Sequence, residues 1–356
     1  MQKYLGKLLS ETPINLTVGG RCFNSMNYEE GRKMRRISFS PMLYITLILG
    51  LLFAPFAHAA TLEVGIGKPY TTIQSAINAA VNGDTVLVYP LTYTENIDFN
   101  GKEITVRSVK GAASTIIDGK RKDGSVIVFM NNEGPASVID GFTIINGSGT
   151  LDSFSIPAGG GIYCYNSSPT ITNCTITGNT ANGDGGGIYC EYSSPVITNC
   201  TITENRADGY GGGIECAISS PTLKNTILWG DTAPDGKEIY LDEGSTITLT
   251  YSDVEGGWTG TGNIDAYPLF VGNGNYHLTV GSPCIDKGTS EGAPAYDTDG
   301  DPRPQGAGFD IGSDEYTPAS TTCSIWSDVI SKYNAYVSGQ VQWNDVIDCY
   351  NQYVSP

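Results

Sequence analysis

The sequence is poor in histidine and in basic residues. Its 356 residues contain only two histidines, His58 and His277, which excludes a metal site built from several histidines. There are 20 Lys and Arg residues against 37 Asp and Glu residues, so the formal net charge is −17. Binding to nucleic acid needs clustered basic side chains that replace counterions at the phosphates. We therefore expect no nucleic-acid partner.

Familiar catalytic signatures are also missing. The chain has neither a serine-hydrolase motif nor a P-loop. Its 45 glycines follow no Gly-X-Y period, which excludes collagen. Apolar residues make up 40% of the chain, too large a share for a disordered protein. The composition predicts a folded protein whose function must be read from its patterns.

The one long apolar run lies near the N-terminus. Basic Arg35 and Arg36 precede an apolar run over 43–53, and an Ala-His-Ala cleavage site ends at Ala59. This order predicts a signal peptide over 34–59 and a secreted or cell-surface protein, with no transmembrane span after cleavage. The alternative is that the run remains as a membrane anchor. We expect translation to start at Met34, which makes residues 1–33 a non-native upstream extension.

A repeat of 26 residues dominates the middle of the chain. Residues 159–184 and 185–210 agree at 19 of 26 positions without a gap, and residues 211–236 continue the series more loosely. Each unit contains three short runs in which apolar and polar residues alternate, and this alternation predicts β-strands. Three strands per unit, stacked unit on unit, make a right-handed parallel β-helix.

The predicted fold is therefore all-β, with a single right-handed parallel β-helix over 60–316 and a small helical tail over 317–356. In the coils Ile162 and Cys164 point inward, and their equivalents recur 26 residues later. Asn173, Asn199 and Asn225 fall at the turn between the second and third strands. Asparagine tolerates the left-handed conformation there, and its amide can bond to neighbouring coils, so we expect a structural ladder.

These repeats resemble the right-handed β-helix of the pectin lyase-like superfamily. Residues 70–119 are similar to the start of pectinesterase-like β-helices, where an amphipathic helix caps the first coil. Residues 282–316 resemble the C-terminal segment of surface β-helix proteins with a choice-of-anchor module. The resemblance implies the fold over about 61–316. The catalytic patterns of pectinesterases and polygalacturonases are absent from the sequence.

The outer face of the first strand in each repeat is the best candidate site. With Ile162 and Cys164 inward, Tyr163, Tyr165 and Tyr189 face outward and are expected to bind a sugar by stacking. Glu191 and Glu215 lie one coil and two residues apart, roughly 8 Å between backbones, which suits the acid and base of an inverting hydrolase. The alternative is that these side chains only pack on the outer surface.

One further motif has oxygen ligands at alternate positions. Asp297, Asp299 and Asp301 resemble a calcium loop, but the sequence lacks the bidentate Glu of an EF-hand. The alternative is a turn in which Arg303 pairs with Asp310 or Asp314. No other cofactor is expected.

Eight cysteines remain after signal cleavage. The five within the repeats are explained as buried core residues, whereas Cys323 and Cys349 in the tail are the candidates for a disulfide. The tail repeats a short motif that predicts two antiparallel helices around Gly339, serving either as a docking module or as a C-terminal cap.

The sequence as a whole predicts an exported protein that binds polysaccharide or another surface polymer. A polysaccharide lyase or glycoside hydrolase acting on the outer face of the coils is the first alternative. A structural adhesin or surface-layer component is the second.

Overall fold

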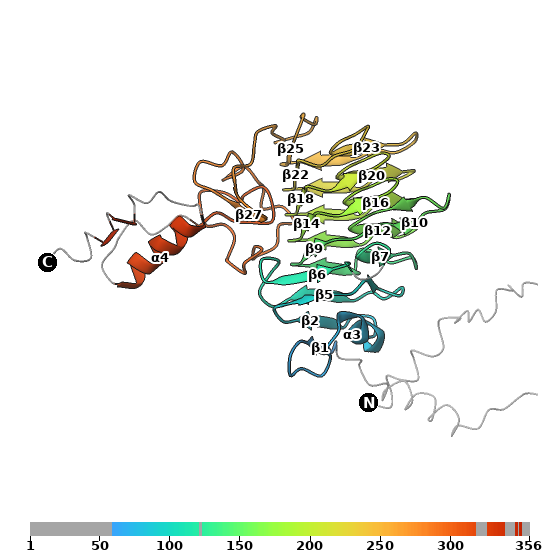
Figure 1. The fold of residues 1–356 in the computed structure, drawn as a ribbon, viewed down its shortest axis with the longest axis horizontal. Helices are drawn as coiled ribbons and strands as arrows, with labels where there is room; N and C mark the ends of the chain where they lie inside the picture. Colours follow the sequence, from blue (N-terminus) through green and yellow to red (C-terminus); the bar gives the residue numbers. More distant parts are fainter. Residues whose placement is uncertain (1–58, 121–122, 318–325, 339–345, 348, 351–356) are drawn as a thin grey trace, which may run out of the picture. The chain divides into compact units, whose positions relative to one another are not determined.

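Three long parallel sheets form the body of the protein. The computed structural model describes residues 59–120, 123–317, 326–338, 346–347 and 349–350. The chain passes through the sheets in turn, coil after coil, and confirms the predicted parallel β-helix. The coils stack vertically in Figure 1, from β1 to β23.

Sheet 1 has eight strands. They are β1 (Thr61–Val64), β2 (Thr85–Val88), β5 (Thr105–Ser108), β8 (Val138–Asp140), β13 (Thr170–Thr172), β17 (Val196–Thr198), β21 (Thr222–Lys224) and β24 (Thr248–Thr250). Sheet 2 has six strands. They are β4 (Ile97–Asp98), β7 (Ile127–Phe129), β12 (Ile162–Tyr165), β16 (Ile188–Glu191), β20 (Ile214–Ala217) and β23 (Ile239–Leu241).

Sheet 3 has seven strands. They are β3 (Leu91–Tyr93), β6 (Thr115–Asp118), β9 (Thr143–Ile145), β14 (Thr175–Thr177), β18 (Thr201–Thr203), β22 (Ile227–Trp229) and β25 (Asp253–Val254). Three two-stranded sheets lie outside these three long sheets. They are β10 (Thr150–Leu151) with β11 (Pro157–Ala158), β15 (Thr180–Ala181) with β19 (Arg206–Ala207), and β26 (Phe270–Gly272) with β27 (Asn275–Leu278).

The 26-residue repeat equals one coil. In sheet 2, Ile162 pairs with Ile188, which in turn pairs with Ile214. Cys164 heads a parallel ladder of cysteines in the same strands. All these side chains are fully buried, so like side chains stack on like along the axis of the core.

A short helix covers the start of the stack, as the sequence predicts. Helix α3 (Ile73–Ala79) begins at Thr72, whose side-chain oxygen accepts a hydrogen bond from the Ser75 backbone N–H. Its buried face consists of Ile73, Ala76 and Ile77. An open coil end would leave the apolar core exposed, and the buried face of this helix packs on that core.

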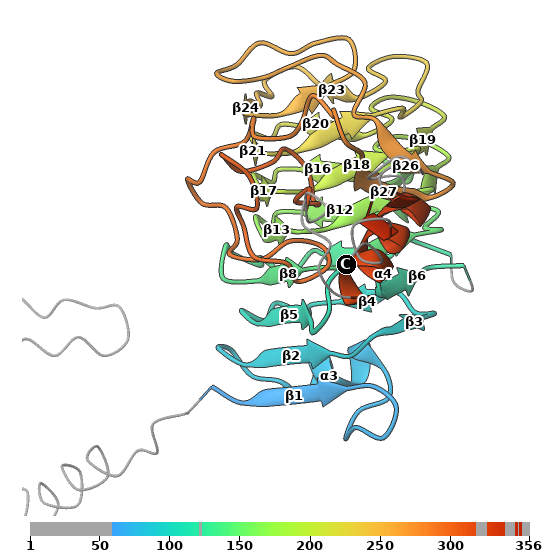
Figure 2. The ribbon, with the colours of Figure 1, turned by 90° about the vertical axis from the view of Figure 1, so that its left-hand side faces the viewer.

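The chain beyond the coils folds back along the stack. Within the described residues, β25 is the last strand of the three sheets, although the sequence predicted coils up to residue 316. The C-terminal segment (residues 266–316) instead lies beside sheet 3, and Figures 1 and 2 show it next to β14 and β18. Its Ser313 hydroxyl lies 3.2 Å from Thr175 Oγ1 and 3.0 Å from Thr201 Oγ1.

A buried arginine holds this segment together. The Arg303 guanidinium donates to the backbone oxygens of Gly312, Ser313 and Asp314 and to Glu315 Oε2 at 2.8 Å. The sequence offered Asp310 or Asp314 as its partner, whereas the ion pair forms with Glu315.

One helix of the predicted tail is described, α4 (Trp326–Val337). Most of the second predicted helix, and all of residues 34–58 of the predicted signal peptide, lie outside the described residues. No helix in the described part of the chain has the length and apolar character needed to span a bilayer.

Candidate functional site

The tyrosines and glutamates predicted as a surface platform stand on the outer face of sheet 2. Tyr163 is in register with Tyr189, which is in register with Glu215. The rings of Tyr163 and Tyr189 are stacked, with centroids 5.7 Å apart. Glu191 pairs with Tyr165 on one side and Ala217 on the other. The strand alternation was therefore predicted correctly.

The expected exposure of these residues was wrong. Tyr163 and Tyr189 are only 2% and 3% exposed, and Glu191 and Glu215 are also buried. The β10–β11 hairpin folds over them: Ser153 Oγ donates to Glu191 Oε1, and the Tyr189 hydroxyl donates to Asp152 Oδ2 at 3.4 Å. The hairpin comes before the first repeat in the sequence, so the repeat pattern could not predict that it covers these side chains.

Burial changes the chemistry of Glu215. Loss of water, followed by repulsion from Asp184 and other charges, raises the pKa of Glu215 to about 9. Its Oε2 atom is buried without a hydrogen-bond partner among the described residues. Glu191 by contrast accepts hydrogen bonds from Ser153 and, at 3.4 Å, from the Tyr163 hydroxyl. Near neutral pH, this raised pKa keeps Glu215 protonated.

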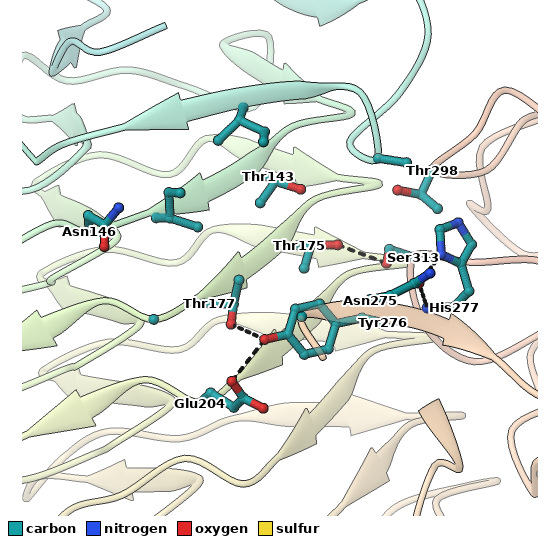
Figure 3. Close-up of a pocket in the computed structure, with 15 residues that line it drawn as sticks. Thr143, Asn146, Thr175, Thr177, Glu204, Asn275, Tyr276, His277, Thr298 and Ser313 are labelled. Carbon is teal, nitrogen blue, oxygen red and sulfur yellow. Dashed lines mark hydrogen bonds between the residues drawn. The ribbon is translucent and has the colours of Figure 1, made fainter. Parts of the chain in front are cut away.

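A cleft that the sequence did not predict lies between sheet 3 and the C-terminal segment. It has a volume of about 540 Å³. One wall consists of outward-facing residues of β9 and β14, and the other of β27 together with Thr298 and Ser313. Figure 3 shows the polar side chains that meet across it. The fold-back of residues 266–316 creates the second wall, so no local sequence motif marks this cleft.

Tyr276 occupies the centre of the cleft. Its hydroxyl lies 2.7 Å from Thr177 Oγ1 and donates to Glu204 Oε2 at 3.0 Å (Figure 3). Phe270 packs edge-on against its ring, with centroids 5.5 Å apart. Burial is the main cause that raises the pKa of Tyr276 to about 12, so the hydroxyl keeps its proton at neutral pH. These contacts fix a ring, a hydroxyl and a carboxylate side by side.

His277 lines the same cleft and faces two carboxylates. Its Nε2 lies 2.6 Å from Asp299 Oδ2 and 3.9 Å from Asp314 Oδ1. Burial lowers the pKa of His277, but the hydrogen bond with Asp299 and the charge of Asp314 outweigh it and raise the pKa to about 9.

The Asp297–Asp301 loop forms a turn around the carboxylate of Asp297. Asp297 Oδ1 accepts hydrogen bonds from the backbone N–H groups of Asp299 and Asp301, and Asp297 Oδ2 accepts one from Glu315 N. The carboxylate of Asp297 thus organises the backbone. A calcium ion held by Asp297, Asp299 and Asp301 remains a prediction.

The predicted asparagines lie at left-handed turns. The φ angles of Asn173, Asn199 and Asn225 are 51°, 50° and 50°. Asn225 Nδ2 donates to Asn199 Oδ1 at 3.1 Å, whereas Asn173 Nδ2 donates to Asp140 and Asn199 Nδ2 to the backbone oxygen of Gly312. The amides therefore bond partly to neighbouring coils and partly to the C-terminal segment.

A second polar ladder escaped the sequence analysis. Asn179 Nδ2 donates to Asn205 Oδ1 at 3.0 Å, and Asn205 Nδ2 donates to Asp231 Oδ1 at 2.9 Å. The 26-residue spacing of these residues was the available signal. Glu238 ends the ladder by accepting a hydrogen bond from the Asp231 backbone N–H.

The cysteines in the repeats are free thiols in the core. Cys164, Cys174, Cys190, Cys200 and Cys216 are buried and unbridged, and so is Cys284. Cys349 is buried, but Cys323 lies outside the described residues, so a disulfide between them remains a prediction.

Residues 81–281 match the family model of the right-handed β-helix region. The chain belongs to this family. No curated protein matches the sequence of this β-helix protein.

Solved structures with a similar course include two pectin methylesterases. The enzyme from carrot has 14% identity and a TM-score of 0.37, covering 62% of this chain and 78% of that chain. The Aspergillus niger enzyme has 14% identity and a TM-score of 0.33, covering 58% of this chain and 84% of that chain. At these TM-scores the likeness is limited to the general course of the coils.

Proposed function

We propose that this β-helix protein is exported and binds a polysaccharide or a related surface polymer in the cleft beside sheet 3. The observation that carries the proposal is Tyr276, held in the cleft between Thr177 and Glu204 (Figure 3). A sugar offers C–H groups to an aromatic ring and hydroxyls to carboxylates, amides and hydroxyls. The cleft presents all of these groups on ordered elements.

The walls of the cleft suit a neutral, hydroxyl-rich chain. Thr143, Thr175 and Thr177 line one wall, and Asn146 adds an amide. Thr143 Oγ1 already donates to Ala112 O and Asn146 Nδ2 to Asp118, so the hydroxyl oxygen of Thr143 and the amide oxygen of Asn146 remain to accept hydrogen bonds from sugar hydroxyls. Apolar contacts with Ile116 and Ile145 between these groups would cover the sugar's C–H surface.

The binding test compares variants of the cleft tyrosine on a glycan array, followed by titration of the best ligand. Tyr276→Ala should weaken binding by about 1 kcal/mol, the typical contribution of an aromatic contact. Tyr267→Ala is the matched control, because Tyr267 is an exposed tyrosine outside the set that lines this cleft. Equal losses in both variants, or ligands that bind the wild type and Tyr276→Ala equally, would contradict this assignment.

Export is tested separately. Expression of the gene from Met34 in a secreting host should release a protein whose N-terminal residue is Ala60, because the predicted cleavage follows Ala59. A product that keeps residues 34–59 and stays with the membrane fraction would support the anchor alternative instead.

A second candidate function is hydrolysis or lyase chemistry on the outer face of sheet 2. The observation in its favour is Glu215, whose raised pKa keeps it protonated near neutral pH on a strand next to that of Glu191, since glycoside hydrolysis requires a protonated acid and a second carboxyl group. Tyr163, Tyr165 and Tyr189 would line such a site, but the β10–β11 hairpin must first move away from them.

Turnover assays decide between these functions. Glu191→Gln should abolish the release of reducing ends or unsaturated products in an enzyme, because an amide cannot exchange the proton, while leaving ligand binding intact. Binding without turnover by the wild type supports the binding protein. Neither binding nor turnover across the array supports the structural adhesin or surface-layer component.

A further inference from the structure

Three separate parts of the C-terminal segment bring potential metal ligands to one point. His277 comes from β27, Asp299 from the turn over 297–301, and Asp314 from the stretch that packs against sheet 3. One ligand atom from each of these residues lies within 4.8 Å of the other two. Among the residues that the structure describes, no other group of three or more His, Cys, Asp or Glu side chains brings its ligand atoms this close together.

Two of the three side chains are oriented by a second partner. Asp314 Oδ2 accepts a hydrogen bond from the Leu278 backbone N–H at 2.7 Å, which leaves Oδ1 directed towards the imidazole. His277 Nδ1 contacts Asn275 Oδ1, an acceptor, so Nδ1 carries a hydrogen and Nε2 is the atom facing the carboxylates. This is the arrangement by which proteins prepare a histidine and a carboxylate for a metal ion.

The distances leave room for an ion. Nε2 and Asp314 Oδ1 are 3.9 Å apart, too far for a hydrogen bond but suitable for two ligands that each lie about 2.0–2.2 Å from one cation. Asp299 Oδ2, at 2.6 Å from Nε2, is closer than two tetrahedral ligands of one ion, which lie about 3.4 Å apart, and must withdraw by roughly 0.8 Å. The Asp299 side chain is 35% exposed and has space to do so.

We propose that His277, Asp299 and Asp314 form a binding site for a divalent transition-metal ion of the Zn²⁺ type. One imidazole nitrogen and two carboxylate oxygens form a donor set that Zn²⁺ accepts; the ion displaces the Nε2 proton of His277 to solvent, and water completes the coordination on the exposed side. Calcium is a poorer match, because it takes six to eight oxygen ligands. This ligand set differs from the calcium loop of the sequence analysis, because Asp297 and Asp301 are not part of it.

The proposed ion would join β27, the 297–301 turn and the stretch ending at Glu315. These three parts form the wall of the cleft that faces sheet 3, so the ion would stabilise that wall. The proposal does not depend on polysaccharide binding, since the ligands are present whether or not a sugar enters.

The test is calorimetric titration of the purified, chelator-treated protein with ZnCl₂ and with CaCl₂. We expect one equivalent of Zn²⁺ to bind and Ca²⁺ to bind far more weakly. His277→Ala and Asp314→Asn should each weaken Zn²⁺ binding at least about 100-fold. Substitution of a residue that only hydrogen-bonds to a metal ligand usually weakens binding less than this. Asp301→Asn is the matched control and should bind Zn²⁺ like the wild type.

A measurement on the wild type guards against variants that fail to fold. The chain has only two histidines, so the imidazole signal of His277 is readily assigned by NMR. One equivalent of Zn²⁺ should shift that signal. The proposal is overturned by a wild type without saturable Zn²⁺ binding, by an unchanged His277 signal, or by Ca²⁺ binding that is preferred over Zn²⁺ and lost in Asp301→Asn.

Discussion

At the scale of single residues, buried polar side chains link the coils to one another and to the C-terminal segment. Asn199 is fully buried, bonds to Asn225 and Gly312, and occupies a left-handed conformation that few residues tolerate. Glu215 lies at the other extreme, with a buried oxygen that has no partner among the described residues. The two residues predict opposite responses to substitution.

Asn199→Ala should lower the free energy of unfolding by about 1–3 kcal/mol, because its buried partners lose their hydrogen bonds. Asn182→Ala, at an exposed position of the same coil system, should cost less than about 0.5 kcal/mol. Urea unfolding of both variants measures the difference. Equal unfolding midpoints would contradict the structural role of Asn199.

Glu215→Gln should stabilise the protein more at pH 8 than at pH 4. The folded pKa of Glu215 is about 9 and its ordinary value is 4.5, so the folded state holds a proton that the unfolded state releases between these values. Stability of the wild type therefore falls as pH rises through this window, and the amide removes that loss.

The stabilisation of Glu215→Gln relative to the wild type should be greater at pH 8 than at pH 4 by more than about 1.4 kcal/mol, the equivalent of one pKa unit. Asp231 and Glu238 also have raised pKa values and impose the same trend, so the variant must be compared with the wild type at each pH. A difference that is constant with pH would show that Glu215 is ionised in the folded protein.

At the scale of elements, the coil is the repeating unit, and its register follows directly from the sequence. The 26-residue spacing predicted that Cys164, Cys190 and Cys216 stack, and β12, β16 and β20 pair in that register. The β10–β11 hairpin was not predictable in this way, because a single short excursion has no repeat to reveal it. Whether Tyr163 and Tyr189 are exposed depends on that hairpin, so the sequence predicted their orientation but not their burial.

The core thiols should be unreactive in the native protein. The six free cysteines of the described residues are all buried, so a thiol reagent should label none of them before urea is added and all of them afterwards. Rapid labelling of Cys190 in the native state would show that the coils open locally.

Peptide mapping without reduction tests the predicted pair in the tail. Peptides containing Cys323 and Cys349 should be recovered as one linked species that separates on reduction. A bridge between Cys164 and Cys190 would instead overturn the view of the repeats as a ladder of free thiols.

At the scale of the whole molecule, contacts between distant parts of the sequence shape the candidate sites. Ser313 lies 112 residues from Thr201 yet is within 3.0 Å of it, and Tyr276 reaches Thr177 across 99 residues. Such contacts leave no periodic signal. The sequence therefore predicted the stack of coils, whereas the cleft and the His277 cluster required the three-dimensional structure.

Arg303→Met should detach the C-terminal segment from the coils. The guanidinium is completely buried, and its loss removes the donor to the backbone oxygens of Ser313 and Asp314 and leaves the buried charge of Glu315 unneutralised, at a cost of about 3–5 kcal/mol. Hydrogen exchange should accelerate over residues 297–316 while strand β5 stays protected. Arg206→Met is the control, since its ion pair is exposed and should contribute less than about 1 kcal/mol.

The fold-back of the C-terminal segment also determines how the molecule would carry tension. A stack of repeats that is pulled from its last unit peels away one unit at a time, because each unit contacts only its neighbours. Here the chain leaves the last coil at β25 and is fastened again through Ser313 to Thr175 and Thr201 and through Gly312 to Asn225. A force applied to the chain beyond residue 316 would therefore act on the middle coils, at an angle to the axis of the stack, and would not act on the last coil. Several contacts would have to break together before any coil could unwind.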